Sequence, residues 1–353
     1  MTDYIAIEID QALAALDDFD TIIDVRSESE FAEDHLPGAI NCPVLNDAER
    51  AEVGTLDKQV SPFDARRRGA ALVSRNIGRL LEEQFADRPR HWKPLVYCWR
   101  GGQRSGSLSV VMQRVGWQVR RLDGGYKAFR AAVRDALETL PTAFEYRVVV
   151  GPTGSGKSRL LVELAGAGAQ VLDLEQLAAH RGSVLGGLPE HAQPSQKAFE
   201  TRIWQTLRRF DPARPVYVES ESKKVGNVRV PEVLIERVRE SPCLALELPL
   251  EARIELLREE YSHFEHDLGA LFAQLDCLLE LHGRARVGEW KSLALAGDWP
   301  AFVHRLLVEH YDPAYQRSIR RNFRQLEQAR RLALSSGTQE EFAALARSLG
   351  AEG

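Results

Sequence analysis

Residues 151–158 read GPTGSGKS and match the phosphate-loop pattern G-x-x-x-x-G-K-[ST] at every position. The apolar segment YRVVV comes directly before this octet, and SRLLVELAGAG, with apolar residues at helical spacing, follows it. A strand, a glycine-rich turn and a helix in this order are the setting in which the pattern binds phosphate groups. The octet therefore predicts a parallel α/β sheet with the loop at the carboxyl end of one strand.

The residue types in the octet predict how a diphosphate would be held. Glycines let the backbone approach the ligand, and N–H groups at the start of the helix donate to phosphate oxygens. Lys157 would reach the outer phosphate, and the Ser158 hydroxyl would bind Mg²⁺. The predicted diphosphate-binding residues are Gly151, Thr153, Gly154, Ser155, Gly156, Lys157 and Ser158. Any ligand with two linked phosphates would satisfy them, and a glycine-rich turn without a ligand is the alternative.

Acidic side chains follow two further predicted strands of this sheet. Asp173 lies in QVLDLEQ, and Glu219 and Glu221 lie in PVYVESES. Because the carboxyl ends of parallel strands share one edge, we expect these carboxylates beside the phosphates, where they would organise Mg²⁺ or take a proton. A helix cap or a surface charge is the alternative for each. The stretch 180–197 is too long for a routine connection, so we predict a functional loop or lid there.

The segment YCWRGGQRSGS, residues 97–107, places Cys98 at the end of another predicted strand, PLVYCW. Its two glycines let the backbone curl so that N–H groups point at a bound anion. Ser105 is a predicted N-cap, and the positive end of its helix would favour the thiolate form of the cysteine. The predicted anion cage comprises Trp99, Arg100, Gly101, Gly102, Gln103, Arg104 and Ser105. We predict a nucleophilic Cys98 assisted by Arg100 and Arg104; a buried, inert cysteine is the alternative.

The segment IIDVRSESEFAEDHLPGAIN, residues 22–41, resembles the N-terminal signature of rhodanese-fold sulfurtransferases, and LDGGYKAF resembles that fold's closing motif. The resemblance implies that the loop cysteine carries a covalently bound sulfur atom. Cys98 and Arg104 enclose five residues rather than the commoner four, which is the spacing of cysteine phosphatases. A loop longer by one residue makes a larger cage, so the cargo is either a phosphate or a chalcogen bulkier than sulfur.

The order of strand and helix signals indicates two α/β units and a helical end. We predict a rhodanese-like sulfur- or selenium-transfer domain over residues 1–138, a P-loop diphosphate-binding domain over 145–250, and a helical, charged C-terminal region over 251–353. The segment ETLPTAFE, residues 138–145, interrupts the pattern between the first two.

Composition excludes several classes of protein. A formal net charge of −5 argues against a generally basic, sequence-blind nucleic-acid binder. The four cysteines show no metal-ligand spacing, so we expect no structural zinc, and we expect no haem or flavin. No apolar run approaches the roughly 18 residues of a membrane helix. The N-terminal segment MTDYIAIEID does not resemble a signal peptide, which leads us to expect a cytoplasmic protein without membrane partners.

The segments YCWRGGQRS, GPTGSGKS, DLEQLAAHRGSVLG and VESESKKVGN occur in this order, and with them the whole chain resembles the tRNA 2-selenouridine synthase family. The resemblance implies a transferase that replaces sulfur with selenium at C2 of the wobble uridine in the tRNA anticodon stem-loop. It further implies selenophosphate and geranyl diphosphate as substrates, an S-geranyl-2-thiouridine intermediate, and Cys98 as the selenium carrier. We also expect a transient contact with the enzyme that supplies selenophosphate.

Contacts with RNA are predicted from a basic stripe. YQRSIRRNFRQ, residues 315–325, places Arg317, Arg320, Arg321 and Arg324 at helical spacings of three and four. These side chains would follow tRNA phosphates; a solvated helix face is the alternative. A base held for chemistry would have to be unstacked, and Trp99 or Tyr126 could receive it.

Two other functions fit parts of the pattern. A cysteine phosphatase fused to a P-loop kinase fits the Cys98–Arg104 spacing, although the loop offers no acid to protonate a leaving alkoxide. A nucleotide-gated persulfide carrier or RNA-binding module would bind ATP tightly and produce no modified nucleoside.

Overall fold

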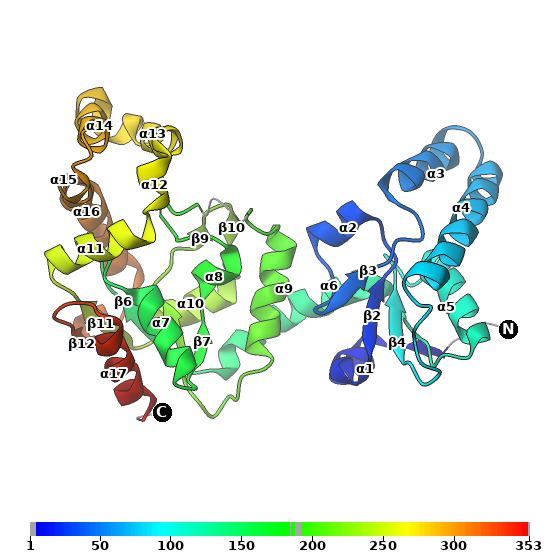
Figure 1. Cartoon of the computed structure of the whole chain (residues 1–353). Coiled ribbons are helices and arrows are strands. Elements are labelled where there is room, and N and C mark those ends of the chain that lie inside the picture. The colour runs from blue at the N-terminus through cyan, green and yellow to red at the C-terminus, as the bar shows by residue number, and fades with distance from the viewer. Residues whose placement is uncertain (1–4, 184, 188–191, 352–353) are drawn as a thin grey trace. The chain divides into compact units, whose positions relative to one another are not determined.

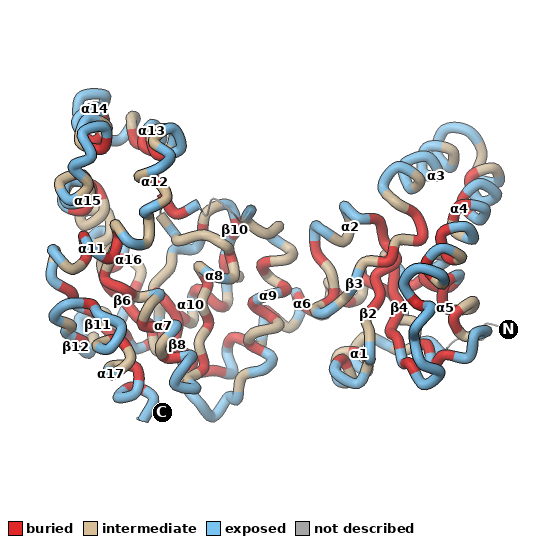
Figure 2. Tube along the Cα trace, viewed as in Figure 1, coloured by how far each residue is buried: buried red, intermediate tan, exposed pale blue. Residues whose placement is uncertain are grey.

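The computed structural model describes residues 5–183, 185–187 and 192–351 (Figure 1). The chain divides into two compact units, Met1–Ala136 and Leu137–Gly353. Each unit is built on its own five-stranded sheet. In both units buried residues follow the strands, while the outer sides of the helices are exposed (Figure 2).

The sheet of the first unit is parallel throughout. Its strands, in spatial order, are β1 (Ile5–Ile7), β5 (Arg120–Leu122), β4 (Pro94–Tyr97), β2 (Thr21–Asp24) and β3 (Ala39–Asn41). In the central pair, Ile23 lies opposite Val96. All four residues of β4 are buried, as expected for a strand covered on both faces. The predicted parallel α/β fold of this half is confirmed.

Helices connect these strands. They are α1 (Ile9–Ala14), α2 (Glu28–Glu33), α3 (Asp47–Gln59), α4 (Pro62–Glu83), α5 (Gln103–Val115) and α6 (Gly125–Leu137), with a short 3₁₀ turn η1 at Leu16–Asp18. Three of these helices, α2, α3 and α4, begin at side-chain caps. Ser27 and Glu30 form a reciprocal capping box at the start of α2. Gly116, in the left-handed region at φ 109°, ends α5.

The second unit also has a parallel sheet. Its spatial order is β12 (Arg330–Ala333), β11 (Cys243–Glu247), β6 (Tyr146–Val150), β8 (Val216–Glu219) and β7 (Gln170–Leu172). A small antiparallel hairpin, β9 (Lys224–Val225) and β10 (Val228–Arg229), follows β8. The edge strand β12 was not predicted, because the sequence from residue 251 onward was interpreted as helical.

The helices of this unit form two groups. Those around the sheet are α7 (Lys157–Gly166), α8 (Leu174–Ala178), α9 (Gln196–Leu207), α10 (Glu232–Glu240), α11 (Leu250–Glu260) and α17 (Gln339–Gly350), with 3₁₀ turns η2 (Leu140–Ala143) and η4 (Leu326–Gln328). Between α11 and β12 lie α12 (His263–His266), α13 (Leu268–Asp276), α14 (Leu279–Leu295), α15 (Trp299–Leu306), the π-helical turn η3 (Leu307–Tyr311) and α16 (Asp312–Asn322).

The helices between α11 and β12 have an apolar core of their own. Leu271, Trp290 and Phe302 are buried together in it. No helix in the described part of the chain has the length and hydropathy to cross a membrane.

Candidate functional site

The phosphate loop connects β6 to α7 and curls around the Lys157 amine. Gly156 caps the helix at φ 83°, and a β-carbon there would collide with the Phe342 ring, so this position requires glycine. Lys157 Nζ donates to the Gly151 carbonyl at 2.9 Å, which holds the amine at the loop. The sequence predicted both the loop and its flanking elements, and the structure has them at those positions.

A buried arginine fastens the loop to two helices that are distant in sequence. Arg253 of α11 donates through Nε to the Thr153 carbonyl at 2.9 Å. Its other nitrogens pair with Asp312 of α16, the closest contact being 2.6 Å. Since Arg253 is only 6% exposed, this pair is shielded from water and fixes the loop's position.

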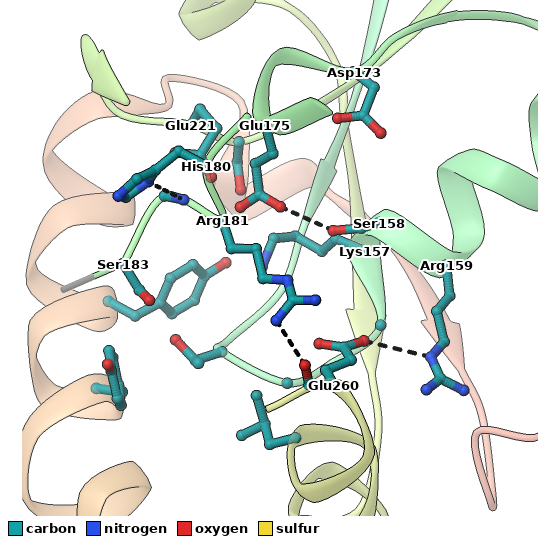
Figure 3. Close-up of a pocket in the computed structure, with 18 of the residues that line it drawn as sticks. Lys157, Ser158, Arg159, Asp173, Glu175, His180, Arg181, Ser183, Glu221 and Glu260 are labelled. Atoms are coloured by element: carbon teal, nitrogen blue, oxygen red, sulfur yellow. Dashed lines mark hydrogen bonds and ion pairs between the residues drawn. The ribbon is translucent and has the colours of Figure 1, made fainter. Parts of the chain in front are cut away.

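The loop opens on a cavity of about 850 Å³ (Figure 3). Thr153, Gly154, Gly156, Lys157 and Ser158 of the predicted set line it, together with Asp173 and Glu221. Gly151 and Ser155 of the predicted set do not line it, and Ser155 is fully buried. Further walls come from α7, the 180–183 segment, the residues after β8, α11, the η3–α16 helices and α17. Of the predicted lid, residues 184 and 188–191 lie outside the described residues.

The carboxylates beside the loop form a hydrogen-bonded group. Glu175 accepts from the Ser158 hydroxyl at 3.0 Å (Figure 3). The backbone N–H of Glu175 donates to Glu219 at 2.8 Å. Asp173 is the N-cap of α8 and accepts a hydrogen bond from the Gln176 N–H at 2.7 Å. The alternative interpretation of Asp173 as a helix cap is therefore correct for this contact. Glu219 is the last residue of β8 and is buried, so it does not line the cavity as predicted. Its Oε2 atom has no hydrogen-bond partner among the described residues.

Burial raises the pKa values of this group. It raises the pKa of Glu175 to about 8, and the Glu221 carboxylate nearby acts in the same direction. Burial also raises the pKa of Asp173 to about 6 and that of Glu219 well above its usual range. At neutral pH this group therefore holds protons that isolated carboxyl groups would have lost.

The raised pKa values predict that the second unit loses stability as the pH increases. Its folded state binds these protons more tightly than the unfolded chain, so the stabilisation is complete below about pH 4.3 and disappears as the pH rises to about 8. Glu175→Gln is uncharged at every pH. At pH 8.5 we expect Glu175→Gln to raise the Tm of the second unit, because it removes a buried negative charge. The increase should be about 2–4 °C for each kcal/mol of stability gained, and at pH 5 the Tm should change little.

Differential scanning calorimetry measures this difference, with the second unit's transition recognised as the one that inorganic diphosphate shifts. Glu251→Gln is the control, because Glu251 is an exposed residue in the first turn of α11. An equal effect of Glu175→Gln at pH 5 and pH 8.5 would contradict the prediction.

In the first unit, Cys98 follows β4 and lies buried just before α5. The helix begins at Gln103 with Gly102 as N-cap, so the prediction that Ser105 is the N-cap is wrong. Ser105 lies in the first turn, where its hydroxyl donates to Cys98 Sγ at 3.2 Å. Ser105 therefore contacts the sulfur directly, although it does not cap the helix.

The loop is fastened to the start of α6. The N–H groups of Tyr126 and Lys127 donate to the Cys98 and Trp99 carbonyls at 2.8 and 2.9 Å. Gly101 has φ 66°, and a β-carbon there would lie 2.6 Å from the Leu122 carbonyl oxygen. Arg121 also donates to the Gly101 carbonyl. The Tyr126 and Lys127 contacts come from the LDGGYKAF segment that carries the resemblance to the rhodanese closing motif, and Arg121 lies just before it.

The two loop arginines differ in their surroundings. Arg104 is held by Glu30 at 2.7 Å, and Arg50 also pairs with Glu30 at 3.1 Å. Burial alone would raise the pKa of Glu30, but these guanidinium groups lower it, so the carboxylate is ionised. Arg100, Gly102 and Gln103 are exposed, while Gly101 is buried. Anion binding by both arginines remains a prediction.

Of the two aromatic residues considered for base stacking, Tyr126 belongs to the core. It is 1% exposed, its hydroxyl donates to Asp34 at 2.8 Å, and the Arg26 guanidinium lies 4.0 Å from its ring centre. Trp99 is half-buried and packs beside it, with 5.3 Å between the ring centres.

The basic stripe is shorter than predicted. Arg317, Arg320 and Arg321 are exposed on α16, but the helix ends at Asn322, and Arg324 beyond it pairs with Glu240 at 2.7 Å. The same helix contributes Ala314, Tyr315 and Ser318 to the phosphate-loop cavity.

Comparisons with known proteins match both units. A family model described as the tRNA 2-selenouridine synthase AAA domain matches residues 144–278, and a rhodanese-like domain model matches residues 8–132. A tRNA 2-selenouridine synthase from Sulfurovum sp. is 33% identical over 85% of this chain and 89% of its own length. The chain belongs to the tRNA 2-selenouridine synthase family. A synthase from Marinobacter nauticus is 32% identical over 83% of this chain and 87% of its own. One from Nitrosomonas europaea is 37% identical over 68% of this chain, and that match spans 63% of the relative.

Several cavity residues were not predicted from the sequence. They are Glu175, Glu260, Tyr261, His310, Tyr311 and Tyr315, whereas His180 and Arg181 belong to the predicted 180–197 loop. Glu175 could have been found, since it lies two residues after Asp173 in DLEQ. The tyrosines and His310 lie on helices far along the chain, where nothing local in the sequence links them to the loop.

Proposed function

We propose that this protein converts 2-thiouridine at the wobble position of tRNA to 2-selenouridine through an S-geranyl intermediate, with geranyl diphosphate and selenophosphate as the other substrates. One observation carries the proposal. The chain aligns with 89% of a tRNA 2-selenouridine synthase and carries both a diphosphate loop on a large cavity and a cysteine loop in a separate unit.

The first step would use the phosphate-loop cavity. The thiocarbonyl sulfur of the base attacks C1 of the geranyl group, the C–O bond breaks, the diphosphate leaves with the electron pair, and the base loses its N3 proton. Lys157 and the loop N–H groups would stabilise the charge that develops on the diphosphate. A volume of about 850 Å³ leaves room for a nucleobase beside the diphosphate.

The donor set at the loop fits Mg²⁺. The Ser158 hydroxyl and the carboxylates of Asp173 and Glu221 line the cavity, and Mg²⁺ prefers such oxygen ligands. Among the described residues no group of three or more His, Cys, Asp or Glu side chains could hold a metal, so the ion would take most of its ligands from the diphosphate and water. When bound, Mg²⁺ neutralises charge on the leaving diphosphate.

The second step would use Cys98. Alkylation turns the sulfur of the base into a leaving group, because a thiolate departs from an isothiourea-like carbon far more easily than sulfide departs from a thiocarbonyl. The Cys98 thiolate would first exchange with a small disulfide to give a mixed disulfide. The selenium of selenophosphate would attack the Cys98 sulfur, forming an S–Se bond as the small thiolate leaves, and water would then attack phosphorus, so that the Se–P bond breaks with its electron pair on selenium and phosphate departs. The carried selenium would attack C2, geranylthiolate would leave, and the small thiol would attack the Cys98 sulfur, releasing selenium with the base and restoring the mixed disulfide.

Nucleoside mass spectrometry tests the proposal. With tRNA that contains 2-thiouridine, geranyl diphosphate alone should yield S-geranyl-2-thiouridine, and further addition of selenophosphate and a thiol should yield 2-selenouridine. Release of phosphate from an aryl phosphate, lost in Cys98→Ser, would instead support the phosphatase alternative. Tight ATP binding without any new nucleoside would support a carrier or binding module.

The α16 arginines are expected to contact tRNA. Because Arg317 and Arg321 are exposed on the helix that lines the cavity, phosphates of a tRNA whose base enters the cavity would lie within their reach. Replacing both with alanine should weaken tRNA binding about tenfold and reduce the slope of log K against log salt by about 1 per lost contact.

A filter-binding titration at several salt concentrations measures both quantities. The control is Arg284→Ala with Arg347→Ala, which removes the same charge from two other exposed positions of the second unit. If both double variants bind tRNA equally well, the stripe faces solvent and has no part in RNA binding.

A further inference from the structure

A second, smaller cavity of about 50 Å³ lies among the helices between α11 and α16. Its lining is largely aliphatic and aromatic, with Leu271, Phe302 and Leu306 from the helical core and Leu185 from the 185–187 segment. The charged residues at it are Arg258 and Glu265.

This apolar cavity shares a wall with the phosphate-loop cavity. Thr153 of the loop itself, Leu257 of α11, and the two tyrosines Tyr261 and Tyr311 line both. Ser183 also lines both and shares hydrogen bonds with the two tyrosine hydroxyls. With these hydroxyl groups engaged, the tyrosine rings present apolar surface between the two spaces. A ligand anchored by its phosphates at the loop could therefore extend past them into the apolar cavity.

The chemistry of the lining selects the kind of ligand. A nucleobase needs hydrogen-bond partners for its ring nitrogens and exocyclic groups, and burying these groups unpaired is costly. A branched hydrocarbon needs none and gains free energy from each carbon buried. Since a single water needs only about 10–15 Å³, about 50 Å³ suits the branched end of a chain and not a whole ten-carbon chain.

We propose that the apolar cavity receives the terminal isoprene unit of the diphosphate substrate and thereby determines which chain length the enzyme uses. The diphosphate lies at the loop, the first isoprene unit passes Tyr261 and Tyr311, and the last enters between α13 and α15. This inference rests on the proposed function, because it takes the ligand to be an allylic diphosphate. It adds where the hydrocarbon chain of the substrate binds and which residues limit the length of that hydrocarbon chain.

Substitutions of Val303 test the proposal by making the apolar cavity either smaller or larger. Val303 lies on α15, lines the apolar cavity and is only half-buried, so the helix can accommodate other side chains there. Val303→Phe should fill the cavity, weakening geranyl diphosphate binding at least tenfold while inorganic diphosphate and dimethylallyl diphosphate bind within twofold of wild type. Val303→Ala should enlarge it and raise the affinity for farnesyl diphosphate relative to geranyl diphosphate. Opposite shifts from two substitutions at one site cannot arise from partial unfolding.

The measurement is isothermal titration calorimetry of the full-length protein with these four diphosphates, alongside the formation of alkylated nucleoside. Val308→Phe is the matched control, since Val308 is 47% exposed and lines neither cavity. If wild type alkylates tRNA with geranyl diphosphate but neither Val303 variant changes chain preference, the inference is overturned and the proposed function stands. If wild type forms no alkylated nucleoside and binds geranyl diphosphate no better than inorganic diphosphate, both fail.

Discussion

Replacing Lys157 with alanine is expected to abolish the transfer of the geranyl group to 2-thiouridine, with a loss of rate of at least about 100-fold. The Lys157 amine lies at the phosphate loop, held 2.9 Å from the Gly151 carbonyl, and is the loop's own positive charge for the leaving diphosphate. Removing it leaves the charge on the departing oxygens to the backbone N–H groups and to bound Mg²⁺. The amount of S-geranyl-2-thiouridine formed with time, measured by nucleoside mass spectrometry, checks this result.

Lys58→Ala provides the control, because Lys58 is an exposed lysine in the last turn of α3 in the other unit. It should alkylate tRNA at the wild-type rate. Undiminished alkylation by Lys157→Ala would mean that the diphosphate is bound somewhere other than the phosphate loop.

Replacing Cys98 with alanine is expected to prevent formation of 2-selenouridine completely while S-geranyl-2-thiouridine still forms. The thiolate is the proposed carrier, so without it no S–Se bond can be made. The phosphate-loop cavity is built wholly from residues of the second unit and should keep its shape. In the presence of both small substrates the alkylated nucleoside should therefore accumulate.

Cys277→Ala is the matched control for this variant, because Cys277 is the exposed cysteine of the chain whereas the other three are buried. It should convert tRNA to the selenium product as wild type does. Continued formation of 2-selenouridine by Cys98→Ala would exclude Cys98 as the carrier, and loss of alkylation as well would show that the two steps share one site.

The sequence was sufficient to predict the parts of the fold in which local pattern and tertiary structure agree. The octet at 151–158 needs a strand before it and a helix after it, and β6 and α7 provide both. The apolar segments ending near Cys98 and Glu219 are buried strands of parallel sheets, β4 and β8. In such segments continuous burial requires the apolar run that the sequence displays.

Other features could not be predicted because they depend on contacts between distant segments. The strand β12, with exposed arginines and one buried residue, Leu332, has little apolar pattern and is defined by its pairing with β11. The pairing of Arg104 with Glu30 spans 74 residues. Tyr261 and Tyr311 reach the cavity from the end of α11 and the start of α16, two helices that the Arg253–Asp312 pair joins at the phosphate loop.

The central claim, that alkylation and selenium transfer occur at separate sites in the two units, is tested most directly with tRNA that already carries S-geranyl-2-thiouridine. This tRNA is incubated with Lys157→Ala protein, selenophosphate and a thiol, and its nucleosides are analysed for 2-selenouridine. The selenium product is expected to form, because this substrate no longer needs the phosphate loop. Absence of the product, under conditions in which wild-type protein converts the same tRNA, would contradict it.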